Sequence, residues 1–152
     1  MDITLAVNKK DVYKEVAQTT EYTGGKIEGN DVYENISTTD EDEGILERFW
    51  NESKNIVCNE FKKVLESETE SGDNYQLKLH LSSAFDNALT ESMQRSLFSF
   101  FVMNIVSKWY TFTNKEEASG YAAEAATYMD DIKRKAFYKK KPVRPTYEFK
   151  IE

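Results

Sequence analysis

The residues with the greatest potential for chemistry are one cysteine, Cys58, and one histidine, His80. A thiolate nucleophile needs a base within hydrogen-bond reach, and these two residues are far apart in the sequence and on different predicted elements. We expect Cys58 to be a small buried or half-buried side chain and His80 to point outward from a strand. No catalytic residue is therefore predicted. An enzymatic role would require His80 or Cys58 to lie in a pocket beside a carboxylate.

Two other short motifs could bind ligands. The carboxylates of residues 40–43 could bind a hard cation, but they lack the spacing of a calcium-binding loop, so a solvated helix start is favoured. The run Thr23-Gly24-Gly25-Lys26 lacks the spacing of a phosphate-binding loop and favours a flexible turn. The sequence thus predicts no metal, no cofactor and no small-molecule substrate.

The composition limits the class of protein. The chain has 152 residues, a net charge of -7 and a pI of about 4.9, which indicates one domain that repels polyanions as a whole. A general nucleic-acid binder is disfavoured. One cysteine and one histidine exclude a disulfide scaffold and a zinc module. The longest apolar stretch, residues 97–106, is about half of a membrane span, so we expect a soluble protein from a reducing compartment with no membrane partner.

The first half of the chain alternates between strand and helix patterns. Residues 2–7 have the period-two alternation of a half-buried strand, and a helix is predicted from Asn8 to about Gln18. A glycine-rich loop over 23–30 and a short element over 32–36 follow. A long amphipathic helix is expected to begin near Thr39 or Asp40. Its apolar face comprises Ile45, Leu46, Phe49, Trp50, Ile56, Val57, Phe61, Val64 and Leu65.

The second half is predicted from equally simple patterns. Residues 66–74 are polar and favour a loop, and residues 75–81 alternate as a strand with Tyr75, Leu77, Leu79 and Leu81 inward. Ser83 and Asp86 resemble a capping box for a central core helix over 84–111. Another helix is expected from Asn114, with small residues along one side.

The last residues are predicted to form an extended arm. Pro142 and Pro145 prevent a helix, and residues 146–151 alternate as a strand. The fold class predicted is mainly α, an antiparallel bundle of three main helices with a few short β-strands and an extended C-terminal arm. The division is a single helical domain with an N-terminal strand over 1–138 and the arm over 139–152.

Opposite charges are segregated along the chain. Residues 133–152 hold eight basic and two acidic residues, whereas residues 28–47 hold eight acidic residues and no basic one. A basic tail can bind nucleic acid or an anionic membrane, or simply improve solubility. It can also dock on the acidic segment of the next copy, and an alternating arm can add to a neighbour's sheet edge. The predicted interface residues are Lys139, Lys140, Lys141, Pro142, Arg144, Pro145, Tyr147 and Phe149 of the arm, and Asp40, Glu41, Asp42 and Glu43 of the acidic segment.

Several features together resemble small structural proteins of tailed bacteriophages. They are the acidic opening of the long helix over 39–50, the apolar helix ending in Ser107-Lys108-Trp109-Tyr110, the helix opening Asn114-Lys115-Glu116-Glu117, and the arm from Lys139 to Pro145. The chain is in this respect similar to the head–tail connector or adaptor proteins. The resemblance implies a ring of copies beneath the portal, an arm that grips neighbours, and a negative lumen that DNA passes without sticking. The strands over 2–7 and 75–81 depart from a purely helical adaptor and leave a tail-tube or tail-completion role open.

These observations predict a non-enzymatic structural subunit of a phage particle that assembles through its C-terminal arm. Its expected partners are further copies of itself in a ring, portal or tail proteins, and DNA in passing without specific binding. We expect it in the virion, after synthesis in the bacterial host cytoplasm. The alternative is an acidic, soluble regulatory or inhibitor domain that binds a basic partner protein one to one.

Overall fold

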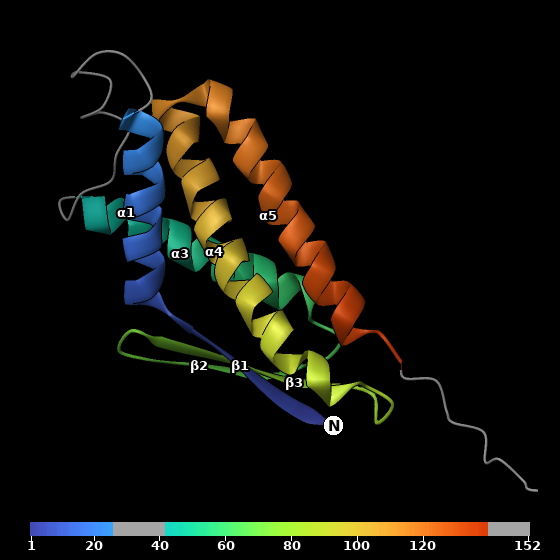
Figure 1. The fold of residues 1–152 in the computed structure, drawn as a ribbon. Coiled ribbons are helices and arrows are strands. Elements are labelled where there is room, and N and C mark those ends of the chain that lie inside the picture. The colour runs from blue at the N-terminus through green and yellow to red at the C-terminus, as the bar shows by residue number, and fades with distance from the viewer. Residues whose placement is uncertain (26–41, 140–152) are drawn as a thin grey trace, which may run out of the picture.

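The computed structural model describes residues 1–25 and 42–139. These residues form a small sheet whose one face is covered by helices (Figure 1). The elements in chain order are β1 (Asp2–Asn8), α1 (Lys9–Gly25), α3 (Glu43–Glu60), β2 (Leu65–Ser71), β3 (Asn74–His80), the 3-10 helix η2 (Asn87–Leu89), α4 (Thr90–Thr113) and α5 (Lys115–Ala136). The mainly helical fold class is confirmed, but in the described part of the chain four helices and a three-stranded antiparallel sheet replace the expected three-helix bundle.

The sheet has the strand order β1-β3-β2, and both pairings are antiparallel. In β1 and β3 the alternation predicted from the sequence is confirmed, since Leu5 pairs with Leu77 and both side chains are fully buried. Directly opposite residues share a face of a sheet. The apolar residues of both strands therefore face the helices, and the polar residues between them form the open face.

The prediction of a loop over residues 66–74 is wrong. Most of this segment is strand β2, which turns into β3 at Gly72 and Asp73. Gly72 has a φ of 60°, a conformation that glycine adopts without steric cost. β2 was missed because the side chains that it turns toward the helices are carboxylates: Glu68 and Glu70 pair with Leu77 and Tyr75 and share their face of the sheet.

Helix α4 is the centre of the structure, as its apolar composition predicts. It contacts α1, α3, α5 and β1, and Phe101 and Ile105 are fully buried. Its longest neighbour is α5, which runs back alongside it after the break at Asn114 (Figure 1). An aromatic cluster joins α3 to the sheet. The ring centroid of Phe101 lies 4.6 Å from that of Trp50 and 5.9 Å from that of Tyr75. The core therefore depends on the contacts that α4 makes with all four of these elements.

Helix α1 is longer than the sequence predicts. α1 continues to Gly25 instead of ending near Gln18, and Thr20, within the extension, is fully buried with its hydroxyl donating to the Val16 carbonyl. Burial of Thr20 favours continuation of the helix despite the low helix propensity of Gly24 and Gly25. Residues 23–25, which the sequence assigns to the glycine-rich loop, are therefore helical.

The long helix and the core helix are both shorter than predicted. α3 begins at Glu43 and ends at Glu60, so Val64 and Leu65 lie beyond it, and Ile45 is exposed rather than on the apolar face. α4 begins at Thr90, directly after the 3-10 helix η2. The Asp86 carboxylate accepts from the Ala88 amide at 3.1 Å and caps η2, not the core helix α4.

Two predicted elements and most of one predicted interface lie outside the described residues. They are the short element over 32–36, the strand over 146–151, and all of the arm except Lys139. Of the predicted acidic interface, Asp40 and Glu41 also lie outside, whereas Asp42 and Glu43 are described.

Candidate functional site: a basic groove between helices α3 and α5

A groove of about 710 Å³ lies where the end of α3 meets the last turns of α5. Its lining residues are Asn59, Glu60, Lys62, Lys63, Lys133 and Phe137. Three of these are lysines, and one carboxylate, Glu60, opposes them. The groove therefore presents positive charge around an apolar surface.

The groove is built on a buried anchor. Phe61 ends α3, is fully buried, and accepts at its carbonyl from the Val64 amide at 2.9 Å. This turn fixes the backbone on which Lys62 and Lys63 stand, and both side chains are exposed. Burial of one aromatic side chain thus holds two cations on the surface at a defined place.

The opposite wall comes from the end of α5. The Lys133 Nζ lies 2.8 Å from the Glu60 Oε2, and this hydrogen bond raises the pKa of the lysine. Phe137 follows α5 and is 49% exposed, and its neighbour Tyr138 is 52% exposed. Large apolar side chains exposed next to cations are a common feature of protein interaction surfaces.

The chain leaves this region at Lys139, the one residue of the predicted arm interface that is described. Lys139 is exposed and forms an isolated antiparallel bridge with Phe85, which is buried after β3. Whatever follows Lys139 therefore starts from a fixed position beside η2. The remaining predicted arm residues, Lys140, Lys141, Pro142, Arg144, Pro145, Tyr147 and Phe149, lie outside the described part of the chain.

The acidic residues gather at the other end of α3. Glu43 is exposed in the first turn and Asp42 is half-buried just before it. Burial first, and then the charges of Glu47, Glu43, Glu70 and Asp73, raise the pKa of Tyr13. Four carboxylates from α3 and the β2–β3 hairpin therefore create a negative potential on this side of the molecule. Two cations offset part of it: the Lys9 Nζ lies 3.9 Å from the Glu47 Oε1, and the Lys54 Nζ pairs with the Glu70 carboxylate.

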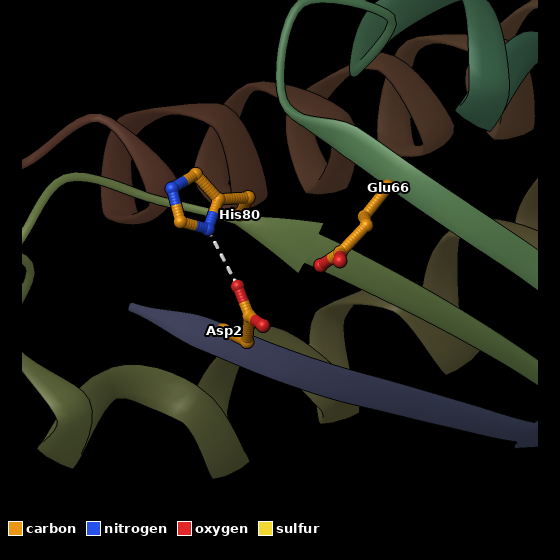
Figure 2. Close-up of side chains that lie close together, drawn as sticks. All are labelled: Asp2, Glu66 and His80. Atoms are coloured by element: carbon orange, nitrogen blue, oxygen red, sulfur yellow. Dashed lines mark hydrogen bonds and ion pairs between the residues drawn. The ribbon is translucent and has the colours of Figure 1, made fainter.

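A second cluster lies on the open face of the sheet. Asp2, Glu66 and His80 come from the three different strands, and Figure 2 shows the imidazole Nδ1 of His80 directed at the Asp2 carboxylate. The two atoms are 2.5 Å apart, and this hydrogen bond lowers the pKa of Asp2. His80 is exposed and points outward, as predicted.

This cluster has a ligand set that suits a divalent cation. One atom from each of the three residues lies within 4.8 Å of the other two, and imidazole with carboxylates binds transition metals. A protein cation is already present, however. The Lys78 Nζ lies 3.8 Å from Asp2 and 3.9 Å from Glu66, so a metal ion would have to displace this ammonium group. The geometry is that of a cross-strand ion-pair network on an exposed surface.

Cys58 lies in a third polar cluster, on the helix-covered side of the sheet. Its Sγ donates to the Glu68 Oε2 at 2.8 Å, and the Tyr75 hydroxyl donates to the same oxygen at 2.7 Å. Burial, and then the hydrogen bond to Glu68, raise the pKa of Cys58 to about 11. A thiol that stays protonated is a poor nucleophile at neutral pH.

The two residues with potential for chemistry are thus on opposite faces of the sheet. Each has a neighbouring carboxylate, Glu68 for Cys58 and Asp2 for His80, but neither residue lines the groove at α3 and α5. Nor does either line the hollow beside β1 and α4 or the one between α1 and α5. The sequence did not predict the roles of Lys62, Lys63, Phe137, Glu66 or Glu68. Two adjacent lysines directly after an apolar helix face were the available signal for the groove.

The chain matches no protein-family model, no curated protein and no solved structure. Within residues 1–25 and 42–139, the helices are too short or too polar to cross a bilayer.

Proposed function

We propose that this protein is a non-enzymatic structural subunit that assembles with copies of itself, in the manner of a head–tail connector ring of a tailed bacteriophage. One observation carries the proposal: surfaces of opposite charge lie at the two ends of α3. Asp42, Glu43 and Glu47 are at its start, and Lys62 and Lys63 follow its end.

The separation of these surfaces favours contact between copies. α3 has 18 residues, and at 1.5 Å per residue its ends are about 27 Å apart. Charges in solution are largely screened beyond about 8 Å at physiological ionic strength. The two surfaces therefore do not neutralise each other within one molecule. Two different complementary patches on one subunit form a head-to-tail contact, which closes into a ring when the rotation per subunit allows it.

The C-terminal arm adds a second contact to this proposal. Lys139 leaves the body from a fixed position beside Phe85, and the residues after it contain further basic side chains, Lys140, Lys141 and Arg144. An arm that starts at a fixed point reaches a neighbouring subunit at a lower entropic cost than one that starts from a loose end. Portal or tail proteins and passing DNA are the other partners that the resemblance implies, with the virion as the site of action.

One observation favours a second candidate function. The carboxylates of Glu43, Glu47, Glu70 and Asp73 act on the same tyrosine, Tyr13, so they are concentrated on one side of the protein. A compact negative surface is also what an acidic regulatory or inhibitor domain needs to bind a basic protein. Such a domain would act as a single copy.

Deletion of residues 139–152 separates the two candidates. We expect the full-length chain to self-associate in sedimentation velocity at low salt, or to bind a portal ring. The truncated chain should keep the far-ultraviolet circular dichroism of a helical protein and sediment as a monomer, since α5 ends before the deletion. A truncated chain that forms the same oligomer would contradict the role of the arm. A full-length chain that stays monomeric and binds a basic protein one to one would favour the regulatory domain.

A further inference from the structure

We infer that the basic groove between α3 and α5 binds the acidic segment 28–47 of a neighbouring copy. This inference rests on the proposed self-assembly and deepens it. It names a basic surface on the folded body that receives the acidic segment. The sequence predicted such a surface only in the C-terminal arm.

The groove has the chemistry to receive an acidic peptide. Lys62 and Lys63 are exposed on a turn fixed by buried Phe61, and the Lys133 side chain stands opposite. Glu60 already pairs with Lys133, so Lys62 and Lys63 supply the cationic charge that remains. Lysines on a rigid turn lose little further backbone freedom when they bind a carboxylate.

The segment 28–47 complements the groove in both charge and apolar character. Its eight acidic residues match the lysines. Val32, Tyr33 and Ile36 lie among them in the sequence and match the exposed ring of Phe137. An occupant with charge alone would leave that aromatic surface in water.

A second copy is a better source of this segment than the same chain. The groove lies about 27 Å from the start of α3, the length of that helix. A residue that precedes Glu43 needs about eight fully extended residues to cover this length. The segment must also return to α1, whose Thr19 lies beside Gly120, and the groove at Lys133 is about 20 Å further along α5. That return needs about six more extended residues, so intramolecular docking would need nearly all of the 16 residues from 26 to 41 at full stretch. A neighbouring copy carries no such constraint.

The test uses a fluorescent synthetic peptide of residues 28–47 and the full-length chain, with fluorescence anisotropy at low salt. We expect the wild-type chain to bind the peptide and the double variant Lys62→Glu, Lys63→Glu to bind it at least ten-fold more weakly. The matched control is Lys10→Glu with Lys14→Glu, which changes the net charge equally at exposed positions on α1. Equal affinity for wild type and the groove variant, or an equal loss in the control, would overturn the inference.

Sedimentation of the same variants distinguishes this inference from the proposed function. If the groove variant is folded by circular dichroism and assembles like wild type, the groove is not the receptor, while self-assembly itself stands. If the wild-type chain never self-associates but still binds the peptide in the groove, the proposed self-assembly fails instead. The variant Phe137→Ala gives a second reading, since it should weaken peptide binding without changing the charge of the groove.

Discussion

The two faces of the sheet use polar residues in different ways. On the helix-covered face, Glu68 and Glu70 point toward α3, and each receives hydrogen bonds from more than one partner. On the open face, Asp2, Glu66, His80 and Lys78 form ion pairs with side chains that are 44% to 71% exposed. The same residue types are therefore structural on one face and only weakly stabilising on the other.

Burial of the donors is the cause of this difference, because Trp50 and Tyr75 are almost completely buried whereas Glu68 and Glu70 themselves remain exposed. A buried polar group that loses its partner keeps the full cost of its desolvation, whereas an exposed one is solvated again by water. Inward-facing carboxylates on β2 also discourage the pairing of this edge strand with other chains, because charged side chains oppose edge-to-edge association. The covered face should thus be sensitive to substitution and the open face tolerant.

The largest effect is expected for Trp50 of α3, the buried partner of Glu70 on the helix-covered face. This side chain is fully buried, and its ring centroid lies 4.6 Å from that of Phe101. Its indole N–H donates to the Glu70 Oε1 at 3.2 Å. Trp50→Ala should lower the free energy of unfolding by about 3–5 kcal/mol. Urea denaturation followed by circular dichroism measures it.

The control for that experiment is Thr4→Ala, at an exposed position of the open face on β1. It should change the free energy of unfolding by less than about 0.5 kcal/mol. Similar losses for the two variants would contradict the distinction between the faces.

A second prediction concerns the reactivity of Cys58. With its pKa raised to about 11, about 0.1% of the thiol is ionised at pH 8, so alkylation by iodoacetamide should be on the order of 100-fold slower than for an unperturbed thiol. Glu68→Gln should speed the reaction, because it removes the negative charge next to the sulfur and leaves only a neutral amide oxygen, a weaker hydrogen-bond acceptor. Burial remains, so the rate should not reach that of a free thiol. The rate of alkylation against pH measures both effects.

The matched control is Glu66→Gln, which changes the same residue type on the open face and should leave the rate at Cys58 unchanged. If Glu68→Gln has no effect, burial alone sets the reactivity. The raised pKa also has a consequence for stability. The folded state holds the thiol proton more tightly than the unfolded chain, so this contribution is complete below pH 9 and is lost as the pH rises toward 11.

The predictability of the two faces from sequence differs in the same way. Strands β1 and β3 were predictable because their inward residues, such as Leu5 and Leu77, are apolar and alternate with polar ones. β2 was not, because its inward residues are Glu68 and Glu70. Its signal was a strict alternation of glutamate with serine or threonine over residues 66–71, followed by Gly72. This alternation predicts a strand only if tryptophan, tyrosine and cysteine donors are known to face those carboxylates. The positions of these donors depend on the tertiary fold.

The groove was only partly predictable, for a related reason. Lys133 belongs to the basic tail that the sequence identified. Lys62 and Lys63 lie far from it along the chain and come close to it only because the ends of α3 and α5 meet in the fold. The acidic segment, in contrast, was visible as a local run. Runs of like charge can therefore be predicted from the sequence, whereas the surfaces that could bind them depend on the fold.

The smallest effect is expected for Asp2 on the open face. Its hydrogen bond with His80, and the nearby Lys78 charge, lower the pKa of this carboxyl below its usual 3.8. A depressed pKa means that the stabilisation is present above pH 4 and is lost as the pH falls through the folded-state value. Asp2→Asn should therefore cause a slight decrease in the urea midpoint at pH 6, and the two proteins should converge near pH 2. Because the carboxylate is exposed, 0.5 M salt should reduce the difference at pH 6. A difference that survives salt and is as large as that for Trp50→Ala would show that this ion-pair network is structural, and would remove the contrast between the two faces.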